Sequence, residues 1–201
     1  MKKFELTSEF VTFLGKKLFR IKALISFGNV EEGELGGYVE KEENLSNDGN
    51  AWVYGNAWVY GNARVYGDAR VSGDAEVYGD AEVSGNARVS GNAWVYGNAE
   101  VSGNARVYGN ARVYGDAWVS GDAEVSGNAD YATVHGFGSE YRTTTFFRTK
   151  AGDIGVRCGC FYGTLEEFRA KVKETHGETK TAKEYLMVAD LMEFRFSKEE
   201  A

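Results

Sequence analysis

Cysteine and histidine are scarce in this sequence, and long hydrophobic runs are missing. The 201 residues contain two cysteines, Cys158 and Cys160, with one residue between them. Such a pair does not make a disulfide framework, and we expect the chain to work in a reducing compartment. No apolar run is long enough to cross a membrane, and the basic start lacks the apolar segment of a secretory signal. We therefore expect a cytoplasmic protein with no membrane partner.

Basic charge is also in deficit. The formal net charge is −7, which favours solubility and argues against a general affinity for nucleic acid or for anionic membranes. The hydrophobic content of 43% is ordinary for a globular protein. Composition therefore excludes little else, and the order of the residues carries the information.

A six-residue phrase, Asn/Asp-Ala-X-Val-Tyr/Ser-Gly, is repeated thirteen times without interruption from Asn50 to Gly127. We call each copy a hexad. A fixed short period predicts a solenoid, in which each unit buries its apolar face by stacking on the next. Alternation along a short strand turns Ala and Val inward and X with Tyr/Ser outward. The following Gly-Asn or Gly-Asp pair tolerates the backbone conformations of a tight corner.

The hexad resembles the repeat of left-handed parallel β-helices, in which an aliphatic residue such as Val53 is followed four places later by a small one such as Ala57. That resemblance implies a triangular coil of three hexads. The fold class we expect is therefore mainly β, a parallel β-solenoid with a little over four perfect coils.

The X positions leave a second coil size open. With eighteen residues per coil, like charges stack, as in Arg70 over Arg88 and Arg88 over Arg106. With twelve residues per coil, a column of X residues alternates in sign, which favours a two-sided roll. Exposed pairs contribute only about 0–1 kcal/mol each. We favour the triangle because the spacing of inward residues fits the family, and we keep the roll as the alternative.

Different sequence patterns flank the array. Residues 1–34 predict a β-hairpin cap from two apolar runs at 4–13 and 18–27, and residues 35–134 form the predicted solenoid. Residues 135–201 predict a small ββαα domain, with strands in 141–150 and 154–161. Two capping boxes, Thr164 with Glu167 and Thr181 with Glu184, predict the two helix starts.

Aromatic residues dominate the predicted outer surface. In the triangular coil one face carries a column of tyrosines flanked by two tryptophans: Tyr60, Tyr78, Tyr96 and Tyr114, with Trp58 and Trp94. Trp52 and Trp118 are expected elsewhere on the outside. One interpretation is cross-strand stabilisation of the ladder. The other is a binding surface for a partner or a second copy, because a monomer does not need this much exposed apolar area.

Two further groups are candidate sites. Arg70, Arg88 and Arg106 form a stripe that either receives an anion or is a solvated polar face. Cys158, Cys160 and His176 are weak zinc candidates, because zinc usually takes four ligands and spaces its cysteine pairs more widely. A buried packing role for the two thiols is the favoured reading, so we predict no metal, no cofactor and no catalytic residue.

The resemblance also bears on function. Many left-handed β-helix proteins are acyltransferases with a histidine base and an inserted loop, and these hexads contain neither. Across nearly its full length the chain is similar to uncharacterised hexapeptide-repeat proteins of bacteria and phages, through segments such as Leu18 to Ala23 and Gly36 to Glu40. We predict a non-catalytic scaffold or binding protein of phage or prophage type. An acyl-CoA-dependent acyltransferase and a glycan- or nucleic-acid-binding module are the alternatives.

Overall fold

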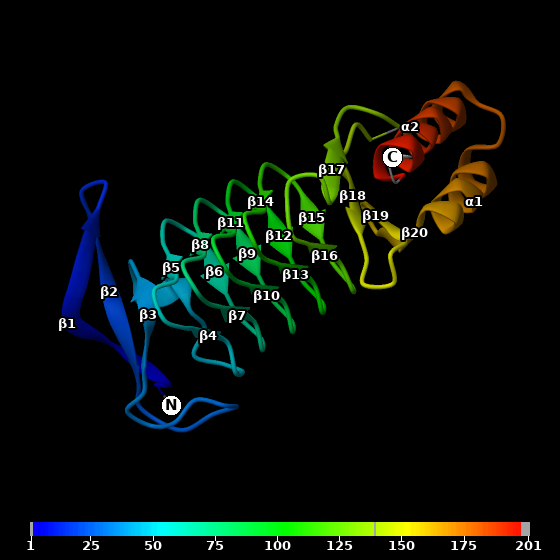
Figure 1. Cartoon of the computed structure of the whole chain (residues 1–201). Helices are drawn as coiled ribbons and strands as arrows, with labels where there is room; N and C mark the ends of the chain where they lie inside the picture. Colours follow the sequence, from blue (N-terminus) through cyan, green and yellow to red (C-terminus); the bar gives the residue numbers. More distant parts are fainter. Residues whose placement is uncertain (1, 139, 198–201) are drawn as a thin grey trace.

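The protein is a rod capped at both ends (Figure 1). The computed structural model describes residues 2–138 and 140–197. Strands β1 (Phe4–Phe13), β2 (Lys16–Ala23) and β3 (Leu35–Val39), with the 3-10 helix η1 (Glu42–Asn44), form the N-terminal end. The solenoid and a C-terminal sheet with two helices follow.

Each hexad forms one short strand made of X and Val. These strands are β4 (Trp52–Val53), β5 (Trp58–Val59), β6 (Arg64–Val65), β7 (Arg70–Val71), β8 (Glu76–Val77), β9 (Glu82–Val83), β10 (Arg88–Val89), β11 (Trp94–Val95), β12 (Glu100–Val101), β13 (Arg106–Val107), β14 (Arg112–Val113), β15 (Trp118–Val119) and β16 (Glu124–Val125). The fold is thus the parallel β-solenoid that the repeat predicts.

Strand pairing sets the coil at eighteen residues. Arg88 pairs in parallel with Arg70 on one side and with Arg106 on the other. The backbone amide of Arg88 donates to the carbonyl of Ala105 at 2.9 Å, and neighbouring coils repeat this bond. Three hexads per coil is therefore confirmed, and the two-sided roll is wrong. The strand columns are β4-β7-β10-β13-β16, β5-β8-β11-β14 and β6-β9-β12-β15.

The lumen is filled by valine and alanine, as predicted. From Ala51 to Val125 the alanines and valines of the hexads are at most 1% exposed. The corners require glycine: at Gly97, φ is +73°, and an added Cβ would lie 2.9 Å from the amide nitrogen of Gly115. Beside the glycines, side-chain amides connect coils, as Asn98 Nδ2 donates to Asp116 Oδ1 at 2.9 Å.

The first coil would otherwise leave backbone carbonyls without donors, and the N-terminal segment supplies them. The hairpin β1–β2 continues through β3 onto β5, so it extends one face of the rod. The Lys3 ammonium donates to the carbonyl of Ala51 at 2.9 Å. The Asn44 side-chain amide donates to the carbonyls of Gly61 and Ala63, at 3.1 and 2.8 Å. These side chains replace the amides of a missing coil.

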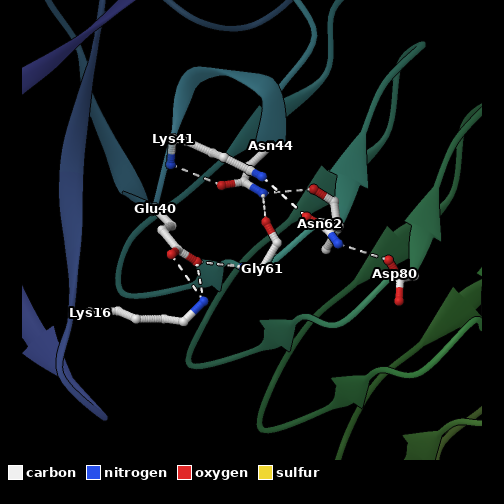
Figure 2. A network of polar contacts seen from close by, with 8 residues as sticks. Lys16, Glu40, Lys41, Asn44, Gly61, Asn62 and Asp80 are labelled. Atoms are coloured by element: carbon white, nitrogen blue, oxygen red, sulfur yellow. Dashed lines mark hydrogen bonds and ion pairs between the residues drawn. The ribbon is translucent and has the colours of Figure 1, made fainter.

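Figure 2 shows how this cap is tied to the rod. Glu40 accepts hydrogen bonds from the Lys16 ammonium and, at 2.7 Å, from the amide of Gly61. Lys41 Nζ donates to Asn62 Oδ1 at 3.2 Å, and Asn62 donates to Asp80. The N-terminal network therefore continues into the row of side-chain hydrogen bonds that joins the corners of successive coils, which we call the corner ladder.

The far end presents amides instead of carbonyls, and its cap supplies acceptors. The amide of Trp118 donates to Thr145 Oγ1, and the amide of Arg112 donates to Asn128 Oδ1, both at 2.9 Å. Thr145 lies on β18 (Thr144–Arg148), which crosses the end of the rod. Phe147 closes the solenoid core, whereas its neighbour Phe146 packs in the C-terminal core, because successive strand residues point to opposite faces.

The C-terminal domain has more strands than predicted. The four-stranded antiparallel sheet has the order β17 (Tyr131–Val134), β18, β19 (Ile154–Cys158) and β20 (Phe161–Thr164). Helices α1 (Leu165–His176) and α2 (Lys180–Phe196) pack on it. The Thr164–Glu167 capping box is confirmed. The Thr181–Glu184 box is wrong, because Thr179 caps α2 by accepting from the amide of Ala182.

Candidate functional site

The four tyrosines of the predicted column lie ring on ring along one face of the rod. Centroids are 5.0 Å apart for Tyr60 and Tyr78, 4.9 Å for Tyr78 and Tyr96, and 5.3 Å for Tyr96 and Tyr114, with nearly parallel planes. The stack covers the ring faces inside the column. Tyr114, at the C-terminal end, has 52% of its surface exposed. We call these four residues the tyrosine column.

Two hydroxyl groups of this column, those of Tyr60 and Tyr78, have raised pKa values. The Tyr60 hydroxyl donates to Glu76 Oε2 at 3.0 Å, and burial together with this bond raises the Tyr60 pKa. Burial and the neighbouring Tyr96 raise the pKa of Tyr78. At Tyr60 and Tyr78 the face therefore offers neutral phenols that donate or accept hydrogen bonds.

One of the four tryptophans is buried, and the other three are partly exposed. Trp52 is fully buried between Phe4 and Phe27, so the prediction that it lies on the exposed surface is wrong. The cause is the N-terminal segment, which covers the first coil from outside. The other three rings are each in contact with another side chain: Trp58 with Phe13 (5.1 Å between centroids), Trp94 with the guanidinium of Arg112 (4.5 Å) and Trp118 with that of Arg157 (3.6 Å).

A cleft of about 620 Å³ lies where the tyrosine column meets the C-terminal domain. Its lining includes Tyr96, Tyr114, Arg112, Leu191 and Arg195. Within residues 2–138 and 140–197, neither of these two guanidinium groups is paired with a carboxylate. The cleft thus combines apolar walls with two cations. The sequence places Tyr96 and Tyr114 here, but the approach of α2 follows only from the tertiary structure.

The arginine stripe exists as a stack on another face. Arg70, Arg88 and Arg106 are neighbours in successive coils. Arg106 lies 3.7 Å from Glu124, and no described carboxylate is in ion-pair distance of the other two. A cleft of about 420 Å³ lies against Arg88, Ser90, Arg106, Tyr108 and Glu124. The stripe is solvent-accessible, with one of its three charges partly neutralised.

Cys158 and Cys160 have different environments. The Thr144 hydroxyl donates to Cys158 Sγ at 3.2 Å, and the Tyr185 hydroxyl lies 3.9 Å from that sulfur. Cys160 follows Gly159, whose φ is +56°, and is exposed in the turn, so only Cys158 fits a packing role. The His176 ring contacts the Tyr185 ring, at 5.8 Å between centroids. Among the described residues, no group of three or more His, Cys, Asp or Glu side chains is arranged to hold a metal ion.

Comparison with known proteins supports the repeat architecture. A family model described as YdcK Beta solenoid repeat matches residues 57–73, 63–79, 81–97 and 105–121, all within the hexad array. No curated protein matches the chain. None of the described helices is long and apolar enough to cross a membrane. The chain is a β-solenoid repeat protein.

Proposed function

We propose that the protein is a non-catalytic binding rod whose tyrosine column and adjoining cleft dock another protein chain. The main support for this proposal is the position of the tyrosine column on the rod. Four stacked rings run along one face and end at an exposed Tyr114 beside a cleft with two cations. Tyrosine and arginine are enriched among the residues that contribute most to protein interfaces. A rigid row of such residues binds with little loss of conformational entropy.

The ring geometry favours a protein over a glycan or a nucleic acid. Sequence-tolerant binding of single-stranded nucleic acid uses aromatic faces on which bases stack, and sugars likewise lie against ring faces. Inside the column each face is already covered by the next ring at about 5 Å. The rings present edges and hydroxyl groups, which suit peptide backbone and apolar side chains.

The cleft suggests the chemistry of the partner. Arg112 and Arg195 favour carboxylates, while Tyr114, Leu191 and the methyl groups of Val134 favour apolar side chains. We therefore expect the docked segment to alternate or combine acidic and apolar residues. The opposite charge of such a segment also speeds its association with the cleft.

The biological setting belongs to the same proposal. Free cysteines agree with a reducing cytoplasm, and the resemblance to hexapeptide-repeat proteins of phages suggests a phage or prophage origin. An acyltransferase role has less support, because both histidines, His135 and His176, lie outside the hexad array.

A displayed peptide library tests the proposal without knowledge of the partner. Peptides are selected on the wild-type rod and counter-selected on a Tyr96→Ser, Tyr114→Ser variant. We expect enrichment of peptides with acidic and apolar residues on the wild type. A Tyr108→Ser rod, changed on another face, is the matched control and should retain these peptides. Failure to enrich any peptide that distinguishes the wild type from the column variant would contradict the proposal.

A further inference from the structure

Helix α2 carries two apolar faces. Its inner face, which includes Tyr185, Ala189 and Met192, is buried in the C-terminal core. Met187, Leu191 and Phe194 lie on the opposite side and are 62%, 57% and 78% exposed. Their spacing of four and then three residues aligns them along one stripe. A soluble helix that turns such a stripe outward has a surface suited to a partner helix.

The stripe has the spacing of a coiled-coil seam. With Leu191 at position a, Met187 and Phe194 occupy two d positions. Asp190 then falls at g and Arg195 at the following e, on opposite flanks of the seam. Asp190 binds Arg169 of α1, yet its side chain remains 66% exposed. Both flanking charges are therefore within reach of a second helix.

We propose that this stripe pairs with the same stripe of a second copy, the two α2 helices lying parallel about a two-fold axis. Parallel pairing brings Asp190 of each copy next to Arg195 of the other, the g-to-e′ contact of parallel coiled coils. Antiparallel pairing centred on Leu191 would instead place Asp190 near Asp190 of the other copy. The charges thus select a second copy and its direction. The seam shares Leu191 and Arg195 with the cleft beside Tyr114, so the dimer would compete with a segment docked in that cleft, whereas Tyr60 and Tyr78 lie outside it.

The seam is short, and its expected strength follows from that. Three apolar side chains and two ion pairs make a small interface, which gives a reversible, concentration-dependent dimer. A rod joined to its copy at the C-terminal domain would carry two tyrosine columns, and Tyr60 and Tyr78 of each column lie outside the cleft that the seam shares. Two linked sites bind a repetitive or dimeric partner with higher avidity than one.

Sedimentation velocity over a range of concentrations tests the dimer. We expect the wild type to shift from monomer to dimer, and Leu191→Glu to remain monomeric while keeping its circular dichroism spectrum. Leu14→Glu, the same change at the 83% exposed turn of the hairpin, is the matched control and should dimerise normally. Arg195→Glu should weaken the dimer roughly tenfold, because attraction to Asp190 becomes repulsion.

Cysteine cross-linking tests the direction of the helices. In a Cys160→Ser background, a parallel seam predicts that Leu191→Cys forms an intermolecular disulfide, and that Met187→Cys does so as well. Antiparallel pairing would instead cross-link Met187→Cys with Phe194→Cys in mixtures of the two variants. A wild type that stays monomeric at all concentrations, or a dimer unaffected by Leu191→Glu, would overturn the proposal. Peptide docking is judged separately, with the Tyr96→Ser, Tyr114→Ser rod, which leaves the seam residues unchanged.

Discussion

Tyr78 and Tyr96 are eighteen residues apart in the sequence and face each other in space, with ring centroids 4.9 Å apart and planes within 2° of parallel. This contact joins the repeat, the coil and the proposed function. One turn of the solenoid brings each residue back above its predecessor, so a tyrosine at every third hexad becomes a continuous column. The column both stabilises the ladder and forms the surface that we propose for docking.

The stabilising part of this role is open to direct measurement. Replacing Tyr78 and Tyr96 with Ser removes the three ring contacts of the column, and each is worth about 0.5–1.5 kcal/mol. We expect the rod to remain folded and to lose about 1.5–4.5 kcal/mol of unfolding free energy in urea titrations. Serine already occupies the equivalent outward position at Ser72 and Ser84. Complete unfolding of the double variant would show that the column is essential to the fold.

The lumen is far less tolerant. Val89 is fully buried between Val71 and Val107, and no polar group there could pair with a carboxylate. Val89→Asp should cost at least about 3 kcal/mol and disrupt the rod, as judged by circular dichroism and denaturation. The outward neighbour Ser90→Asp is the control and should remain folded. Equal stability of the two variants would contradict the inward placement of valine.

At the corners of successive coils, no two aspartates are neighbours. Asn98 lies between Asp80 and Asp116 in its column, and it donates to Asp116. Asn98→Asp would stack three carboxylates, with an expected loss of about 1 kcal/mol at neutral pH. Like charges raise carboxyl pKa values, so this loss should fade below about pH 4, where the groups are protonated.

Asn110 provides the matched control for that corner. Its neighbours in the column are asparagines, and it accepts a hydrogen bond from Asn92 at 3.3 Å. A carboxylate at this position accepts the same bond, so Asn110→Asp should be nearly neutral. If both substitutions destabilise the rod equally at neutral pH, the corner ladder does not distinguish the two residue types.

The buried Lys3 predicts a pH dependence of stability. Burial lowers its pKa from 10.5 to about 8, more strongly than Asp48 and Asp68 raise it. Between these pH values the folded chain binds fewer protons than the unfolded chain, so the contribution of Lys3 to stability rises with pH. We therefore expect the difference in unfolding free energy, wild type minus Lys3→Met, to increase from pH 8 towards about pH 10. A flat or falling difference would contradict the depressed pKa.

Much of the rod follows from the sequence alone, including its coil size if the corners are considered. The X residues favour twelve residues per coil, because their charges then alternate. The corner residues argue against twelve residues per coil, because that coil would place Asp68 next to Asp80. A coil of eighteen residues brings no two corner aspartates together. Exposed X side chains extend into solvent and tolerate like neighbours, but corner side chains bond directly to one another.

The surface was harder to predict than the lumen. Repeat periodicity places Trp52 outward, but the lead-in segment buries it against Phe4 and Phe27. The cleft beside Tyr114 depends on where the C-terminal domain places α2 relative to the last coils, which are distant parts of the chain. Local patterns define the hexads and the Thr164 cap, while such non-local contacts depend on the whole tertiary structure.

The most direct test of the binding function is a calorimetric titration of a selected peptide into three rods: wild type, Tyr114→Ser and Tyr108→Ser. We predict that the Tyr114 variant binds at least about tenfold more weakly, the loss of roughly 1.4 kcal/mol expected for an interface tyrosine. The Tyr108 variant should bind as the wild type does. Equal affinity of all three rods would contradict docking at the tyrosine column.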